Sequence, residues 1–142
     1  MSTPQIVIDT NVFVAALRSR RGASYKLLTL IDSGKFVATV SVPLVLEYKD
    51  AAKRLIDQIA LTARDIDYIL DYICVVARHH AVFYLWRPFL KDPKDDMVLE
   101  LAVSARCDFI VTDNQRDFEG VEQFGISVIT LKEFLQKIGE LP

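Results

Sequence analysis

The sequence predicts an α/β domain in which a mainly parallel central sheet lies between layers of helices. Short segments rich in valine and isoleucine alternate along the chain with longer amphipathic segments, which is typical of a parallel sheet covered on both faces. The 142 residues are enough for one domain with a substantial core. A hydrophobic content of 51% and a charged content of 25% exclude a disordered chain. We therefore expect a single domain over residues 1–142.

Five segments have the composition of short buried strands. The first, QIVI, is the clearest, because it holds three consecutive branched apolar residues just before an acid. FVATV, AVFYL, FIVT and ISVIT follow at intervals long enough for crossover helices. The predicted strands span residues 5–8, 36–40, 81–85, 109–112 and 126–130.

Helical segments separate these strands, and their starts carry residues that cap helices well. Thr10 or Asn11 suits the start of the first helix, Ser41 the third and Thr62 the fourth. The predicted helices span residues 10–18 and 23–34, a segment after Ser41, residues 61–77, a segment that ends near Arg106, and residues 131–139.

Composition also limits the class of protein. A formal net charge of −2 excludes a broadly basic protein but leaves room for a local basic patch. Cys74 and Cys107 are too few for a disulfide framework, so we expect reduced, buried thiols. The N-terminus has no signal-peptide pattern, and no charge-free apolar run approaches the ~20 residues that span a membrane. We expect a cytoplasmic protein without a membrane segment.

Acidic and amide side chains follow two of the predicted strands directly. Asp9 comes immediately after IVI, while Asp113, Asn114 and Asp117 crowd the turn after FIV. In open α/β sheets, functional sites form beyond the carboxyl ends of the strands. Considered alone, Asp9 could simply cap the next helix, and a turn rich in Asp and Asn is ordinary loop chemistry.

Helices carry further candidate acids. Glu47 lies at the edge of the apolar stripe of its helix, where it faces either solvent or a cleft. Asp92, Asp95 and Asp96 begin another helix, where acids interact favourably with the helix dipole. At about 100° per residue, Asp95 falls on the core side with Val98, whereas Asp96 points away. We therefore select Asp95, with Asp96 as the alternative.

Carboxylates that converge at one edge of a sheet repel one another unless a cation lies between them. Sites built from oxygen ligands suit Mg²⁺ or Mn²⁺, whereas zinc favours histidine and cysteine. A magnesium ion held by a few carboxylates commonly acts on phosphate groups. The pattern therefore indicates metal-assisted chemistry on a phosphate ester.

The sequence resembles the PIN-domain family of nucleases. IVIDTNVFVAAL resembles the opening of these domains and VTDNQRDFEGVEQFGISVIT their ending, so that the similarity runs from Ile6 to about Phe134. Within the family it most resembles the VapC-like branch of toxins from toxin–antitoxin modules, which LEYKDAAKRL and DPKDD suit. The resemblance implies a Rossmann-like, three-layer PIN fold with an acidic ribonuclease site that depends on Mg²⁺ or Mn²⁺.

The resemblance also assigns residues. Asp9, Glu47 and Asp95 match the first three acids of the family. At the fourth position some members have an asparagine followed three residues later by an acid, which matches Asn114 and Asp117. Asp113 stands where a basic or polar residue is expected, and it is the alternative to Asp117.

These matches imply roles in hydrolysis of an RNA phosphodiester. Asp9 and Asp95 are expected to ligate the metal, and Asp117 to contact it directly or through water. Glu47 is expected to orient or deprotonate the attacking water. The side chains expected to support these carboxylates by hydrogen bonds are Asn11, Thr112 and Asn114.

The resemblance further implies an RNA substrate such as tRNA or mRNA, a cognate antitoxin protein and a homodimer. Arg18, Arg20 and Arg21 follow the first helix and are either phosphate contacts or a solvated turn. The aromatic run over residues 83–89 favours core or subunit contact over base stacking.

Two other classes of function compete with the nuclease. One is a non-catalytic PIN-like module that binds RNA or a protein, which Asn114 in place of an acid keeps open. The other is a phosphotransfer domain with Asp9 as the phosphorylated group. A haloacid-dehalogenase-type phosphatase would normally have a second Asp where this chain has Asn11.

Overall fold

A five-stranded parallel sheet forms the centre of the molecule, as the alternating pattern predicts. The structure is a computed structural model and describes residues 3–82 and 88–142. The strand order is β3-β2-β1-β4-β5. The strands are β1 (Gln5–Ile8), β2 (Val37–Val40), β3 (Arg78–His79), β4 (Phe109–Val111) and β5 (Ser127–Ile129).

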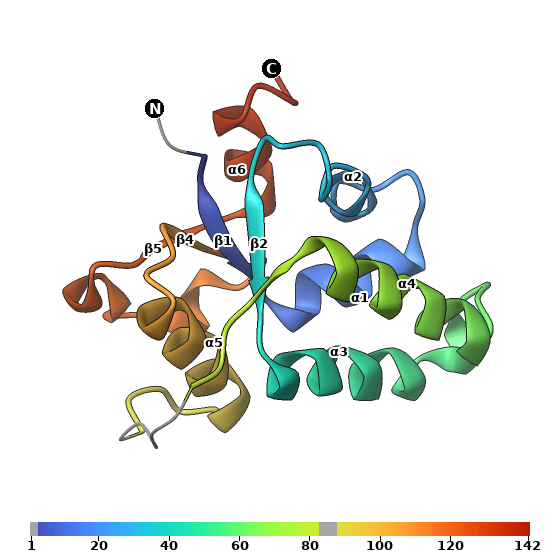
Figure 1. Cartoon of the computed structure of the whole chain (residues 1–142), viewed down its shortest axis with the longest axis horizontal. Helices are drawn as coiled ribbons and strands as arrows, with labels where there is room; N and C mark the ends of the chain where they lie inside the picture. Colours follow the sequence, from blue (N-terminus) through green and yellow to red (C-terminus); the bar gives the residue numbers. More distant parts are fainter. Residues whose placement is uncertain (1–2, 83–87) are drawn as a thin grey trace.

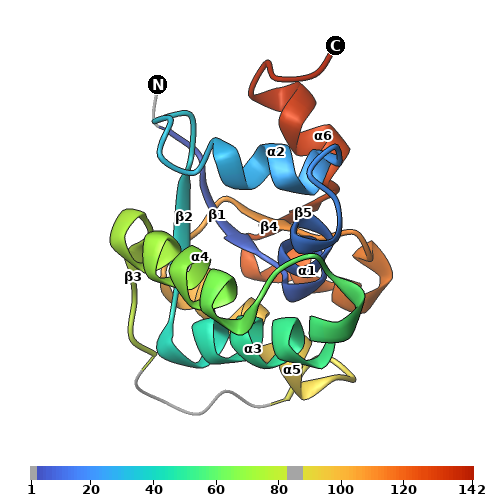
Figure 2. The ribbon, with the colours of Figure 1, turned by 90° about the vertical axis from the view of Figure 1, so that its right-hand side faces the viewer.

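Helices cover both faces of this sheet (Figures 1 and 2). α1 packs on α2 and α3, α2 also contacts α6, and α5 packs on β1 and β4. The α-helices are α1 (Thr10–Arg18), α2 (Ala23–Thr29), α3 (Val42–Arg54), α4 (Ala63–Val76), α5 (Pro93–Ser104) and α6 (Leu131–Lys137), and the 3₁₀ turns are η1 (Ile56–Gln58), η2 (Gln115–Phe118) and η3 (Val121–Phe124).

The third strand does not lie where the sequence suggests. β3 follows α4 at once, and Arg78 and His79 pair with Thr39 and Val40 of β2. The predicted strand 81–85 begins after this pairing has ended, and its residues 83–85 lie outside the described part of the chain. The two residues of β3 are polar, so the sequence has no apolar pattern here that would predict a strand.

Caps fix where the helices near the sheet begin. Thr62 forms a capping box with Asp65 at the start of α4, and the Ser41 hydroxyl accepts from the Leu44 amide at the start of α3, as expected. α1 differs, because its cap is Asp9 rather than Thr10 or Asn11. α2 ends at Thr29, short of the predicted stop at Gly34.

The core lies between the sheet and these helices. β1, β2 and β4 are each buried over all but their first residue, and Phe36 meets Phe134 of α6 edge to face with ring centroids 5.5 Å apart. Within the described ranges, no helix is long and apolar enough to cross a membrane. Because all strands are parallel, their carboxyl ends share one edge, which is the lower edge in Figure 1.

Candidate active site

Asp9 stands at this carboxyl edge, directly after β1. Its side chain is only 5% exposed. One carboxylate oxygen accepts a 2.9 Å hydrogen bond from the Thr10 amide, and the other accepts a 2.8 Å bond from the Thr112 hydroxyl at the end of β4. Asp9 therefore does cap α1, which is one of the two roles that the sequence left open for it.

The surroundings of Asp9 disfavour a negative charge, which a residue that only caps a helix would not need to carry. Burial raises the pKa of Asp9, and the negative charges of Asp117 and Asp113 raise it further, against the lowering effect of the hydrogen bonds from Thr112 and Thr10. An asparagine would cap the helix as well without a buried charge. The carboxylate therefore lies in an unfavourable environment that capping does not explain.

Thr112 connects Asp9 to the loop after β4. Its hydroxyl oxygen accepts a 3.1 Å hydrogen bond from the backbone amide of Asn114. The same oxygen lies 3.5 Å from the side-chain nitrogen of Asn11. The Asn114 side chain in turn donates a 3.0 Å bond to a carboxylate oxygen of Asp117. The structure therefore brings these side chains together as a connected network beside Asp9.

Asp95 belongs to the same acidic group, although it lies on α5. Burial raises its pKa to about 7, and the charges of Asp9 and Asp117, followed by those of Asp92 and Asp96, contribute to this rise. Asp95 and Asp117 also line one cleft of about 790 Å³, together with Asp92 and Glu119. The acid chosen from the helical wheel therefore faces the acids at the strand ends.

Asp96, in contrast, is more buried than the wheel predicts. It is 8% exposed, and one carboxylate oxygen accepts hydrogen bonds from the amides of Phe89 (3.1 Å) and Leu90 (2.9 Å). The prediction that Asp96 points away from the interior is wrong, because the segment before α5 folds back over its first turn. Asp96 holds that segment in place.

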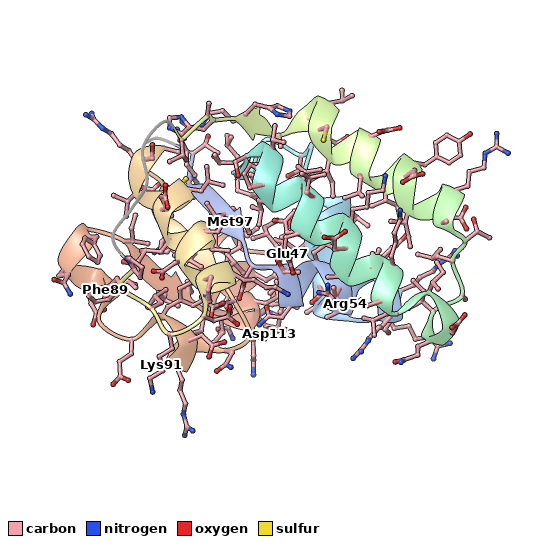
Figure 3. The ribbon with its side chains drawn as sticks, turned by 90° about the horizontal axis from the view of Figure 1, so that it is seen from below. Glu47, Arg54, Phe89, Lys91, Met97 and Asp113 are labelled. Carbon is pink, nitrogen blue, oxygen red and sulfur yellow. The ribbon has the colours of Figure 1, made fainter. Side chains whose placement is uncertain are left out.

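Glu47 lies between α3 and α5 (Figure 3) and is not free. Its side chain is 13% exposed, and its Oε1 atom lies 3.4 Å from Lys94 Nζ and 3.4 Å from Arg54 Nη2. The sequence left open whether Glu47 faces solvent or a cleft, and the structure shows it partly buried against two basic side chains.

The two candidates for the fourth acid occupy different positions. Asp117 accepts from Asn114 and lines the cleft with Asp95. Asp113 does not line this cleft, and its amide lies 3.5 Å from the Asn11 side-chain oxygen; both acids are exposed. Both raise the pKa of Asp9, but only Asp117 also raises that of Asp95. This geometry favours Asp117 as the residue that acts together with Asp9 and Asp95.

The acids suit a divalent metal in kind but do not form a finished metal site. Carboxylate oxygens are the ligands that Mg²⁺ and Mn²⁺ prefer. The mutual repulsion of Asp9, Asp95 and Asp117 is the condition that a cation would relieve. Among residues 3–82 and 88–142, however, no three His, Cys, Asp or Glu side chains are already arranged to hold an ion.

The predicted RNA-contacting arginines lie apart from this cleft. Arg18, Arg20 and Arg21 are exposed, and none of them lines it. Hydrogen bonds from Thr62 lower the pKa of Asp65 at the start of α4, and the charge of Arg20 adds to this effect. The charge of Arg20 therefore acts on the start of α4.

Sequence reasoning missed several residues of the site. The basic partners of Glu47 were not singled out, nor were the cleft residues Lys91, Arg116 and Glu119. Lys94, which lies inside DPKDD one residue before Asp95, was a sign in the sequence of a basic side chain near these acids. Tyr48 was not singled out either, and its hydroxyl donates to the carbonyl of Ile8, the residue before Asp9.

The raised pKa values predict how stability depends on pH without metal. Between 3.8 and about 7, folded Asp95 binds more protons than the unfolded chain does. Stability should therefore fall as pH rises through this window and level off above it, with Asp9 acting in the same direction. Thermal unfolding in EDTA across this pH range measures the effect.

The matched variant for this measurement is Asp95→Asn, which removes the carboxyl group whose pKa rises to about 7. It should flatten the slope of stability against pH and leave the protein more stable near pH 7. A slope of the same size in Asp95→Asn would show that other groups cause the pH dependence.

Comparisons with known proteins agree with this geometry. The family described as "PIN domain" matches residues 5–116. A solved structure described as VapBC2 from Rickettsia felis bound to a DNA fragment from their promoter shares the fold. That likeness has a TM-score of 0.60 at 12% sequence identity and covers 89% of this chain and 98% of the other. No curated protein matches the chain.

The family match includes β1, α1, the helix that carries Glu47, the start of α5 and β4. It therefore covers Asp9, Asp95 and Thr112 and ends one residue before Asp117. The resemblance noted from the sequence motifs is confirmed, and the chain belongs to the PIN-domain family.

Proposed function

We propose that this chain is a metal-dependent endoribonuclease that hydrolyses RNA phosphodiester bonds. The observation that carries the proposal is Asp9, buried at the end of β1 in the field of Asp117 and held by Thr112. Because one fold can host many functions, this site in a PIN domain, rather than the sheet alone, supports the nuclease.

In this proposal Asp9 and Asp95 hold the metal ion, and Asp117 contacts it directly or through water. When bound, a divalent cation supplies the positive charge that polarises a phosphoryl oxygen and lowers the pKa of water. Glu47 orients the attacking water or accepts its proton. Thr112 fixes the orientation of Asp9 by its 2.8 Å hydrogen bond.

The side chains around these acids limit their movement. Asn114 holds Asp117 by a 3.0 Å bond, and Asn11 lies against Thr112 and the Asp113 amide. Such supporting hydrogen bonds commonly matter about 10- to 100-fold in metal affinity or activity. They also explain why the loop after β4 carries amides as well as acids.

The proposed biological role is that of the toxin component of a toxin–antitoxin module in the cytoplasm. The support is the shared fold with a chain of VapBC2, which its description presents as a complex. We propose a protein antitoxin as partner, a homodimer as the assembly, and tRNA or mRNA as the class of substrate. Each of these rests on family likeness.

A second candidate is a PIN domain that binds RNA or protein without cleaving. It is favoured by the absence, in the described ranges, of three acidic or metal-binding side chains already positioned around one ion. The pairing of Glu47 with Arg54 and Lys94 also favours it, because that carboxylate is engaged. Binding of RNA that is indifferent to metal, without cleavage, would support this candidate.

The test is cleavage of a panel of single-stranded RNAs and total tRNA by the purified protein. Activity should appear with Mg²⁺ or Mn²⁺, disappear in EDTA and return when excess Mg²⁺ is added back. Defined internal fragments would identify an endonuclease. No cleavage with either metal at high protein concentration, in antitoxin-free protein, would contradict the proposal.

A further inference from the structure

Glu47 is shared by two basic side chains that come from different helices. Arg54 ends α3 and Lys94 lies in the first turn of α5. Both reach the same carboxylate oxygen at 3.4 Å. Two positive charges therefore meet one negative charge, which gives this small cluster a net positive charge.

The contacts of Arg54 and Lys94 with Glu47 are weak enough for another anion to replace the Glu47 carboxylate. Charge-assisted hydrogen bonds between nitrogen and carboxylate oxygen are typically about 2.7–2.9 Å long, shorter than either contact here. The Arg54 and Lys94 side chains are 57% and 56% exposed, whereas Glu47 is 13% exposed. The cations can therefore reach a ligand in solution while the carboxylate stays between the helices.

The cluster also lies next to the acids. Lys94 precedes Asp95, and α3 packs against both α1, which begins after Asp9, and α5. Figure 3 shows Glu47 between α3 and α5, with Arg54 further along α3. An RNA phosphate that approaches Asp9 meets repulsion from the acids, and the positive charges of Arg54 and Lys94 would offset part of it.

We propose that Arg54 and Lys94 bind an RNA phosphate, and that Glu47 occupies the place of that phosphate in the free protein. This inference rests on the proposed function and adds the groups that receive the substrate. A phosphate that takes over the two cations releases the Glu47 carboxylate for the attacking water. Guanidinium and ammonium groups both suit phosphate oxygens.

The test is binding of a fluorescent single-stranded RNA in EDTA, measured by anisotropy over a range of salt concentrations. Glu47→Gln should tighten binding about 2- to 5-fold, the size expected for the release of ion pairs whose basic partners are exposed. Combining Arg54→Gln with Lys94→Gln should weaken binding and reduce the slope of log K against log salt by roughly 0.7, the value for one phosphate contact on a single strand.

The decisive comparison places Glu47→Gln on the Arg54→Gln/Lys94→Gln background, where the gain in affinity should vanish. A gain that persists there would be a general effect of charge and would overturn the inference. Unchanged affinity in the variant lacking both bases would also overturn it. So would a wild-type protein that binds no RNA at low salt.

Lys49→Gln is the matched control, because Lys49 lies on the same helix and forms an exposed 3.5 Å ion pair with Asp67 of α4. It should leave affinity and salt slope unchanged. Unfolding midpoints of all variants show whether the fold is kept. Since the assay contains no metal, a failure of cleavage would contradict the nuclease without affecting this result.

Discussion

Asp9→Asn is expected to lower RNA cleavage by at least about 100-fold, above the usual 10- to 100-fold cost of losing a residue that merely supports a metal ligand. The same substitution should raise the unfolding temperature of the metal-free protein. The carboxylate is 5% exposed, and burial together with Asp117 and Asp113 raises its pKa. Removing this charge relieves repulsion, while the amide oxygen still caps α1.

The measurement compares cleavage rates with Mg²⁺ and thermal unfolding with and without it. Wild-type protein should gain stability when Mg²⁺ is added, and Asp9→Asn should gain little. Asp108→Asn is the matched control, since Asp108 accepts a 2.8 Å bond from the Gln5 amide at the opposite end of the sheet. Unchanged cleavage by Asp9→Asn would place the active site elsewhere.

Opposite effects on activity and stability separate a functional carboxylate from a structural one. If Asp9 were only a cap, asparagine would be neutral in both measurements. If its charge were needed for the fold, asparagine would destabilise the metal-free protein. The proposed function requires the remaining combination, in which cleavage falls and stability rises.

The part of the candidate site at the carboxyl edge of the sheet could be predicted from the sequence, because the position of Asp9 depends on local features. A buried strand that ends at an acid places that acid at the carboxyl edge of a parallel sheet whatever the rest of the chain does. Asp117 follows from the same logic after β4. Thr112, the last residue before that loop, hydrogen-bonds to Asp9 because β1 and β4 are neighbours.

The helical part of the site was harder to predict, because it depends on packing between distant segments. A helical wheel put Asp95 on the inner side of its helix, but it could not show that the amides of residues 89 and 90 donate to Asp96, which is the more buried of the two. Likewise, no periodicity in α3 reveals that Lys94 reaches Glu47 from another helix. β3 was missed because its two residues pair through the backbone and carry no apolar pattern.

Tyr48 is the buried residue whose loss should cost most near the site. It is 3% exposed, its ring stacks on Phe13 with centroids 4.6 Å apart, and its hydroxyl donates to the carbonyl of Ile8. Burial, followed by the charge of Asp9, raises the pKa of Tyr48, so the hydroxyl stays a neutral donor. Tyr48→Ala should lower the free energy of unfolding by about 3–5 kcal/mol, as for other large aromatic truncations.

Tyr48→Phe separates the hydroxyl from the ring. It keeps the stacking on Phe13 but removes the donor to Ile8, which should cost about 1–3 kcal/mol. Urea denaturation gives both values. Tyr68→Ala is the control, because Tyr68 is 61% exposed on α4. It should change the free energy of unfolding by no more than about 0.5 kcal/mol. Equal losses for Tyr48→Phe and Tyr48→Ala would mean that the hydrogen bond, rather than the ring packing, stabilises the end of β1. Because Ile8 directly precedes Asp9, either loss should also reduce cleavage per folded molecule, which would show that the strand end must be held firmly for the carboxylate to work.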